Sequence, residues 1–468
     1  MASSMDKIMS KLEILAESAK YDVSCSSSGV GRHNNGKIGS AVAAGLCHSW
    51  SADGRCISLL KVLFTNKCVY NCEYCVNRRD NDLPRASFEP EELAKLTIEF
   101  YRRNYIEGLF ISSAVEISPD YTAERILKAI TILRYEYGFA GYIHAKIIPG
   151  VSPEILHDIG LVADRLSVNI EMPNSASLRK FAPQKKPQAI FTPMKQITNT
   201  LIERGQLAGP GNMFHGQKIN VPSNYVGAKN IEHADRALTP IRRKHDGKSF
   251  APAGQTTQMI IGAGSESDAS ILTTSEDLYR TFKMKRVYYS AYVPVVKSGI
   301  LPSLDTAPPL QREHRMYQAD WLLRFYGFTV SELFKSEDEN LDPNIDPKVA
   351  WAIRNLDKFP VEVNRASYNE LMRIPGIGDV SARRILRARK LGSVGFDELK
   401  KMGVVMKRAK YFITCRGKYQ GDRAFLPETI RAAIIGMEDG LQMSMFDNNW
   451  HKLELGAAQE KLSEAGVI

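Results

Sequence analysis

Residues 67–75 read Lys-Cys-Val-Tyr-Asn-Cys-Glu-Tyr-Cys, a stretch that places three thiols at C-x3-C-x2-C spacing just after a β-rich run. Three thiolates on a four-iron cluster leave one iron without a protein ligand, and an open iron can take amino and carboxylate groups. A structural zinc site would favour paired C-x2-C elements with four ligands, and no fourth partner lies nearby. The spacing therefore predicts a 4Fe–4S cluster bound by Cys68, Cys72 and Cys75.

This cysteine loop resembles that of the radical S-adenosylmethionine (SAM) superfamily, in which the motif follows the first strand of a partial barrel. The superfamily has an aromatic residue before the last cysteine, and Tyr74 matches that position. The resemblance implies that Cys68, Cys72 and Cys75 are the catalytic and metal-binding residues. It also implies SAM as a cofactor, an external one-electron reductant and a 5′-deoxyadenosyl radical that takes hydrogen from a substrate.

Short apolar runs alternate with helical stretches from about residue 57 to residue 300, a pattern typical of repeated βα units and a parallel sheet. Helices are predicted at 91–102 and 123–137. The six predicted strands are 57–64, 108–113, 141–148, 165–171, 257–262 and 286–293. The expected fold class is α/β, a partial (βα)6 radical SAM barrel, with a small all-α helix-hairpin-helix domain added.

The resemblance also implies SAM contacts where the predicted strands end. Ser112 and Ser113 stand where the superfamily has a glycine-rich segment with a glutamate for the SAM amino group. Their hydroxyls or carbonyls could replace it, with Glu116 just beyond, although loop packing explains them equally well. Asn169 and Glu171 are two residues apart in a predicted strand, so their side chains face the same side of it. There they suit the ribose hydroxyls of SAM.

Two later segments are also candidate cofactor contacts. Arg179, followed by two lysines, could reach the SAM carboxylate or a nucleic-acid phosphate, or it could be a solvated surface residue. A segment after the fifth predicted strand resembles the superfamily's adenine-contacting edge, where missing side chains allow a flat base to come close. Its candidate residues are Gly262, Gly264 and Glu266.

Three more cysteines precede the loop, namely Cys25, Cys47 and Cys56. They could hold an auxiliary cluster or supply a reactive thiol, but ordinary buried cysteines are the favoured interpretation. The cysteine usage as a whole suits metal binding in a reducing compartment better than a disulfide framework, and no run is apolar enough to cross a bilayer. We therefore expect a cytoplasmic protein without a membrane span.

A second motif lies within residues 364–386, where Ser367 and Glu370 form a capping box that predicts a helix start. Pro375, Gly376, Ile377 and Gly378 then interrupt two amphipathic helices with a tight turn. This pattern resembles the helix-hairpin-helix motif of DNA repair proteins. The glycines let the backbone approach a phosphate, which amides at the next helix N-terminus can bind without reading sequence.

Basic residues support the same interpretation. Residues 349–420 hold 16 Lys and Arg against 6 Asp and Glu, so the chain's whole net charge of +10 lies there. Such a local surplus is typical of a polyanion-binding module, although a solvated basic face or a protein-binding hairpin are alternatives. The candidate nucleic-acid contacts are Arg383, Arg384 and Arg387, with Lys407 and Arg408 in a degenerate partner hairpin.

The domain organisation predicted from these features has five parts. They are an N-terminal extension (1–55), the barrel (56–300), a connector (301–345), the helix-hairpin-helix domain (346–420) and a tail (421–468), with a loop-rich excursion expected at 181–256. In the tail, the pentapeptide Gln442-Met443-Ser444-Met445-Phe446 resembles the motif by which bacterial repair proteins dock on the sliding clamp.

Together the two resemblances imply a radical SAM enzyme that modifies or repairs a nucleotide in DNA. An RNA-modifying enzyme is an alternative, because phosphate contacts do not distinguish the two sugars. A non-enzymatic DNA-binding protein with a structural cluster, like the cluster-bearing glycosylases, is a further alternative. It is disfavoured because the cysteines precede the hairpin by about 300 residues rather than following it.

Overall fold

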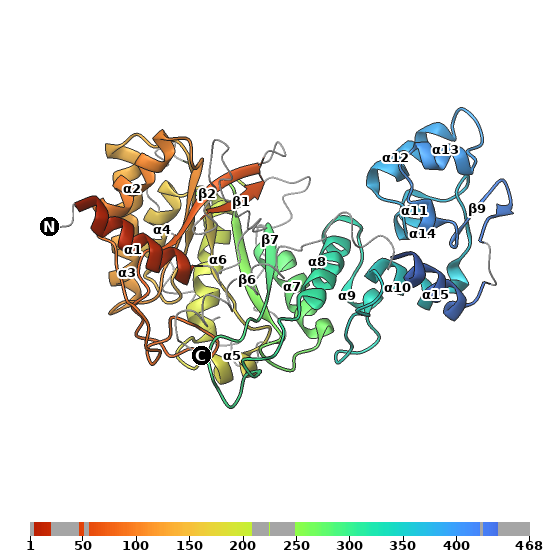
Figure 1. Ribbon diagram of the computed structural model, residues 1–468. Coiled ribbons are helices and arrows are strands. Elements are labelled where there is room, and N and C mark those ends of the chain that lie inside the picture. Colours follow the sequence, from red (N-terminus) through yellow and green to blue (C-terminus); the bar gives the residue numbers. More distant parts are fainter. Residues whose placement is uncertain are drawn as a thin grey trace, which may run out of the picture. The chain divides into compact units, whose positions relative to one another are not determined.

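Six parallel strands form the framework of the first part of the chain in a computed structural model, which describes residues 4–19, 46–50, 56–207, 224, 249–421 and 425–438 (Figure 1). Each strand pairs with the one before it in the sequence, which is the order of a barrel left open. The strands are β2 (Cys56–Leu63), β3 (Gly108–Ser112), β4 (Tyr142–Lys146), β5 (Arg165–Ser167), β6 (Gln255–Ile261) and β7 (Arg286–Ala291). The predicted six-stranded α/β fold is confirmed.

The strands are largely buried, as parallel sheets require, although β6 includes four polar residues, Gln255 to Gln258. Every residue of β3 and β6 is buried. One further strand was not foreseen: β1 (Leu46–Trp50) pairs antiparallel with β2 and extends the sheet at its edge.

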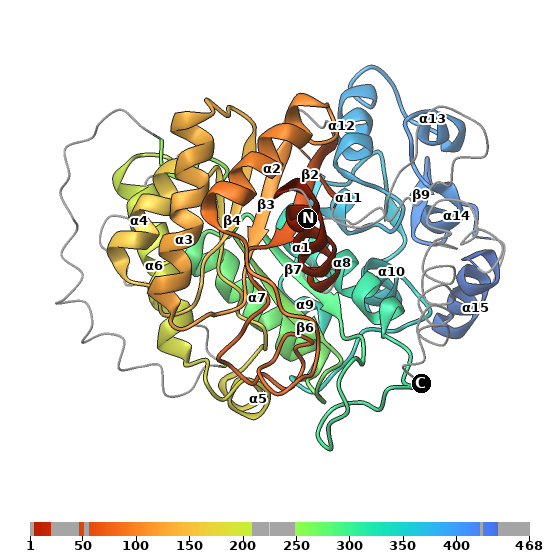
Figure 2. The ribbon, with the colours of Figure 1, turned by 60° about the vertical axis from the view of Figure 1, so that its left-hand side comes forward.

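Helices cover the sheet in chain order. Figure 2 shows α2 (Pro90–Arg102), α3 (Pro119–Thr131), α4 (Pro153–Val162) and α6 (Pro187–Glu203) side by side along it. The loop-rich stretch predicted at 181–256 was wrong at residues 187–203, where α6 lies. Its buried face includes Ile190, Phe191, Met194, Ile197 and Leu201, and an internal Pro193 obscured that helical pattern.

Three other helices belong to this region. The first is α1 (Ser4–Ser18), which has buried apolar residues at the helical spacing seen in the sequence. The others are α5 (Ser175–Phe181) and α7 (Asp268–Phe282), and a π-helical turn (Ile132–Glu136) extends α3.

The chain divides into two compact units. The barrel unit is Met1–Glu266 with Thr273–Glu313, and the hairpin unit is Ser267–Leu272 with His314–Ile468. The predicted connector at 301–345 contains helices α8 (Leu310–Phe325) and α9 (Val330–Leu333), which begin after the prolines that had suggested a linker. The other limits drawn from the sequence stay predictions.

The hairpin unit is mostly helical. Its helices after α9 are α10 (Pro347–Arg354), α11 (Tyr368–Arg373), α12 (Asp379–Ala388), α13 (Phe396–Lys401), α14 (Met406–Ala409) and α15 (Pro427–Glu438), with a 3-10 turn at Leu356–Lys358. In addition to the predicted helices, β8 (Val361–Glu362), β9 (Ile413–Cys415) and β10 (Lys418–Tyr419) form a small sheet.

Some predicted features lie outside the described residues. These are Cys25 and the pentapeptide Gln442–Phe446, and the side chains of Cys47 and Cys56 are likewise not described. Within the described part, no helix is both long enough and apolar enough to cross a membrane.

Candidate functional site

The three cysteines of the motif lie in the loop that follows β2, at the carboxyl end of the first parallel strand. Cys72 is buried, while Cys68 and Cys75 are partly exposed, and all three are free thiols. Burial raises the pKa of the Cys72 thiol and raises that of Cys75 to about 12. These thiols therefore hold their protons at neutral pH and would release them on binding a metal.

The three thiols are the candidate ligands of a metal cluster. No group of three His, Cys, Asp or Glu side chains in the described ranges is arranged to hold a single metal ion. A four-iron cluster is larger than an ion, so its ligands need not converge on one point. Three thiols in one loop, with no nearby fourth ligand, fit a cluster that keeps one iron open.

Arg85 joins the two ends of the cysteine loop. No sequence motif had predicted this role. Its Nη1 donates to the carbonyl oxygens of Asn66, at 2.6 Å, and Asn77, at 2.9 Å. Its Nη2 donates to the carbonyls of Arg78, at 2.7 Å, and Asn81, at 2.8 Å. One guanidinium thus joins the backbone before Cys68 to the backbone after Cys75.

A buried chain of polar side chains leads from the loop to the inner strands. The Tyr74 side chain lies near Cys72 and lowers the pKa of its thiol, against the larger effect of burial. Lys185 Nζ donates to the Tyr74 hydroxyl at 3.3 Å and to Glu171 Oε1 at 2.8 Å. Two of the predicted contacts, Tyr74 and Glu171, are therefore brought together by a lysine that the sequence had marked only as a loop cation.

Lys146, on β4, belongs to the same cluster. Its Nζ donates to Gln258 Oε1 at 3.2 Å, and the amine lies 5.9 Å from the Phe110 ring centroid. Burial lowers the Lys146 pKa to about 7, with the Glu171 carboxylate opposing that shift. Glu171 itself keeps a lowered pKa, because Lys185 and Lys146 outweigh its burial. The cluster therefore offers a carboxylate, an ammonium and an amine that can gain or lose a proton near neutrality.

Asn169 and Glu171 lie together, but the strand alternation expected for them was wrong. Strand β5 ends at Ser167, and the chain rejoins the sheet through a single bridge from Glu171 to Met259. Glu171 has φ of 64°, in the left-handed region that side chains rarely adopt. The Asn169 side chain is hydrogen-bonded to the Glu171 carboxylate, while its Oδ1 is buried without a described partner.

Ser112 and Ser113, at the end of β3, fit a polar ligand. Both hydroxyls are buried without a hydrogen-bond partner among the described residues. Buried polar groups are normally paired, so an orphaned pair at a strand end is what a missing ligand would leave.

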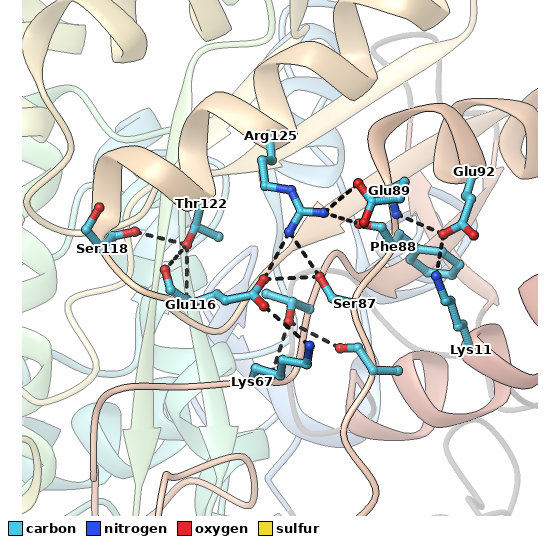
Figure 3. Close-up of polar contacts among 12 residues, drawn as sticks. Lys11, Lys67, Ser87, Phe88, Glu89, Glu92, Glu116, Ser118, Thr122 and Arg125 are labelled. Carbon is cyan, nitrogen blue, oxygen red and sulfur yellow. Dashed lines mark hydrogen bonds and ion pairs between the residues drawn. The ribbon is translucent and has the colours of Figure 1, made fainter.

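Glu116, the alternative contact beyond these serines, is occupied elsewhere. Figure 3 shows its carboxylate held by Arg125, at 3.1 Å, by Ser87, at 3.1 Å, and by Lys67, at 3.5 Å. Arg125 also binds Glu89 at 2.9 Å. These side chains line a cleft of about 620 Å³ that also includes Lys11 of α1.

The remaining predicted cofactor contacts are less enclosed. Arg179 is exposed on α5. Gly262 has φ of 84°, and a Cβ there would lie 2.7 Å from the Pro309 ring. A Cβ on Gly264 would lie 2.6 Å from Glu266 Oε1. The space that these glycines leave is therefore partly taken up by the chain itself, and their contact with adenine stays a prediction.

The helix-hairpin-helix motif consists of two hairpins joined through their backbones. The first turn, Pro375 to Gly378, links α11 to α12, and the second links α13 to α14. The Val405 amide donates to the Gly376 carbonyl at 2.9 Å. Gly376 has φ of 83°, and a Cβ there would lie 2.5 Å from the Val405 oxygen, so only glycine fits.

The predicted phosphate contacts differ in their exposure and in their contacts with other residues of the protein. Arg387 and Lys407 are exposed, and Arg384 donates to the Met402 carbonyl at 3.2 Å. Arg383 pairs with Asp379 at 2.6 Å. Arg408 lies 3.9 Å from Asp346.

Comparisons with known proteins agree with this description of the hairpin unit. Residues 357–408 match a family model described as the helix-hairpin-helix motif. No curated protein sequence matches the chain.

Solved structures with some similarity include the FeFe-hydrogenase maturase HydG from Carboxydothermus hydrogenoformans. It is 15% identical with a TM-score of 0.36, over 56% of this chain and 49% of that one, so the chain spans about half of its length. Methylornithine synthase (PylB) is 12% identical with a TM-score of 0.37, over 56% and 60% of the two chains. A radical SAM methyltransferase from Sphaerobacter thermophilus is 15% identical with a TM-score of 0.29, over 52% and 72%.

The strands and cysteines agree with the fold class expected from the sequence. An open parallel sheet in the order β2 to β7 has a C-x3-C-x2-C loop directly after β2. The hairpin unit contains a helix-hairpin-helix motif.

Proposed function

We propose that the chain is a radical SAM enzyme that acts on DNA, modifying or repairing a nucleotide. Cys68, Cys72 and Cys75 would hold a 4Fe–4S cluster, with SAM as the second cofactor. Once bound and given an electron by an external reductant, these groups would supply a 5′-deoxyadenosyl radical able to take a hydrogen atom from the substrate.

The protein's own side chains bind and orient in this proposal. The Ser112 and Ser113 hydroxyls and the Asn169 amide oxygen, all buried without described partners, bind polar groups of SAM. Glu171 takes the ribose hydroxyls, held in place by Lys185 at 2.8 Å. Tyr74 lies near the Cys72 thiol and accepts a hydrogen bond from Lys185, so it connects the cysteine loop to this pair.

DNA binding is assigned to the hairpin unit. The Gly376 and Gly378 backbone approaches a phosphate, and Arg384, Arg387 and Lys407 add positive charge. These contacts do not select a sequence, so the reacting nucleotide is chosen elsewhere in the protein.

The observation that carries the proposal is the combination of the three free thiols with the buried Tyr74–Lys185–Glu171 chain beside them. A purely structural cluster needs no buried charged side chains beside its ligands. A SAM site needs polar and charged groups to bind the cofactor.

Anaerobic reconstitution tests the enzyme class. The protein is loaded with iron and sulfide, reduced with dithionite and mixed with SAM, with and without duplex DNA, and 5′-deoxyadenosine is measured by chromatography. We expect wild type to form it, faster with DNA, and Cys72→Ala to form none. A fully loaded cluster that yields none under any condition would favour the structural-cluster alternative. Competition between DNA and RNA duplexes for the protein then separates DNA from RNA as substrate.

A further inference from the structure

Helix α8 ends in an exposed aromatic cluster within the hairpin unit. Trp321 and Phe325 lie one helical turn apart, with ring centroids 4.3 Å apart, and the two residues are 52% and 51% exposed. Tyr326 follows directly, and its side chain lies close enough to Trp321 for the indole to lower the pKa of the Tyr326 hydroxyl, although burial raises that pKa overall. Large aromatic residues in contact and half exposed are unusual on a surface without a binding role.

A cation accompanies these rings. The Arg324 guanidinium lies 4.7 Å from the Phe325 ring centroid and 5.9 Å from that of Trp321. The fully buried carboxylate of Asp320 pairs with it at 2.8 Å and fixes its position. Aromatic planes with an arginine beside them form the surfaces on which proteins stack unpaired bases.

The cluster is fixed to the first hairpin. The Tyr326 hydroxyl lies 3.0 Å from the position that a Cβ on Gly378 would take. Lys348 Nζ lies 4.6 Å from the Tyr326 ring centroid and donates to the Ile377 carbonyl at 2.6 Å. The aromatic side chains therefore lie next to the turn that is proposed to hold a phosphate.

A small hollow separates the aromatic cluster from helix α11. It has a volume of about 280 Å³ and is lined by Tyr326, Gly327, Asn369, Glu370 and Arg373. Asn369 is exposed, and its amide offers both a donor and an acceptor to the edge of a base. One aromatic ring of the cluster, that of Tyr326, thus lines the same hollow as the Asn369 amide.

We propose that Trp321, Phe325 and Tyr326 bind an unpaired base of the nucleic acid whose phosphates the hairpin holds. The inference rests on the proposed nucleic-acid binding and adds the form of the substrate, a strand with an unstacked nucleotide. Hairpin contacts read no bases, and an enzyme that reacts with a base must take it out of the stack. Continuity with the hairpin turn, which Tyr326 and Lys348 contact, favours a nucleotide over a protein partner.

The test compares a labelled duplex that carries one bulged base with the same duplex fully paired. Binding to the full-length protein is measured by fluorescence anisotropy. We expect wild type to prefer the bulged duplex and Trp321→Ala to lose about ten-fold in affinity for it. The affinity of Trp321→Ala for the paired duplex stays close to that of wild type. Trp321→Phe keeps most of the preference, because it retains a ring for stacking.

Two controls keep the test specific. Tyr105→Ala removes a similarly exposed aromatic residue, 55% exposed in the barrel unit, and should change neither affinity. Iodouracil at the bulge, photo-crosslinked to wild type, should attach to the peptide that contains Trp321 and Tyr326. This second measurement locates the base even if Trp321→Ala fails to fold.

The outcomes distinguish a failure of base binding by the aromatic cluster from a failure of nucleic-acid binding by the hairpin. Equal binding of both duplexes by wild type, or a crosslink that maps elsewhere, overturns the base-binding cluster and leaves DNA binding intact. No binding to either duplex overturns both. If Trp321→Ala changes only self-association in sedimentation, the surface is a protein contact and the inference is wrong.

Discussion

Lys185 and Glu171 form an ion pair at 2.8 Å in the interior of the barrel unit, with side chains only 14% and 10% exposed. Neither residue could hold its charge there alone, because an isolated buried charge is costly. The pair is therefore a single polar unit, supported by Tyr74 on one side and Asn169 on the other.

Glu171→Gln should destabilise the sheet by roughly 3 kcal/mol, because it leaves the buried Lys185 ammonium uncompensated. Adding Lys185→Met should recover most of that loss, since no unpaired charge remains. Hydrogen exchange of the β5 and β6 amides, followed by mass spectrometry, measures the change locally. Arg102→Met, which breaks a surface pair with Glu99, is the control and should cost less than about 1 kcal/mol. Equal effects of the single and double variants would contradict the coupling.

Arg85→Met should reduce cluster retention about ten-fold, because supporting residues around a metal site act on affinity at that scale. Methionine keeps much of the length of the side chain but none of the four hydrogen bonds. Iron bound per chain after anaerobic loading and gel filtration gives the readout. Arg79→Met, an exposed arginine of the same loop, should retain iron like wild type. Normal iron content in Arg85→Met would show that the loop needs no such support.

Gly376→Ala should destabilise the paired hairpins by about 2 kcal/mol, from the left-handed backbone alone, before the contact with the Val405 carbonyl is counted. Duplex binding should weaken with it. The melting of the hairpin unit, followed by hydrogen exchange in α11 and α12, checks the stability. Gly392→Ala is the matched control, because nothing lies within 4 Å of its Cβ position and its φ is not positive.

Arg387→Ala should lower the slope of log affinity against log salt by about one, if its guanidinium neutralises one phosphate. The affinity for DNA should fall by a similar factor whatever the base sequence of the duplex. Anisotropy titrations over a range of salt concentrations give the slope. Arg103→Ala, an exposed arginine of the barrel unit, should leave it unchanged. An unchanged slope in Arg387→Ala would place the DNA on another face.

Because of Lys348, the free energy of unfolding of the hairpin unit should increase as the pH rises from about 7 to 10.5. Burial lowers its pKa to about 7 in the folded chain, against 10.5 when unfolded, despite the opposing effect of Asp346. Between these values the unfolded state binds more protons, so the free energy of unfolding rises with pH. Lys348→Met should lose this dependence. Denaturant unfolding at several pH values compares the two proteins, and parallel curves would contradict the assignment.

The strands were predictable because most of them contain a short apolar or β-rich run, such as Leu109–Ile111 and Met259–Ile261. The cysteine loop was predictable because its spacing depends only on local sequence. What the sequence concealed depends on contacts over long distances. Strand β1 depends on its antiparallel pairing with β2. Helix α6 contains a proline within an otherwise amphipathic pattern.

The candidate site also contains some residues that local sequence marked and others that only the fold identifies. Tyr74 and Glu171 were found by their positions next to strands and cysteines. Lys185 was one of several cations in a loop, and only the fold selects it, by placing its ammonium between a phenol and a carboxylate. Arg85 bonds only to backbone carbonyls, so no partner side chain in the sequence could have marked it.

Arg85 holds both ends of the cysteine loop through four hydrogen bonds to backbone carbonyls. The three cysteines lie between the two anchored ends, so their positions are linked through one side chain. A change at residue 85 would therefore shift all three thiols together, although it touches none of them.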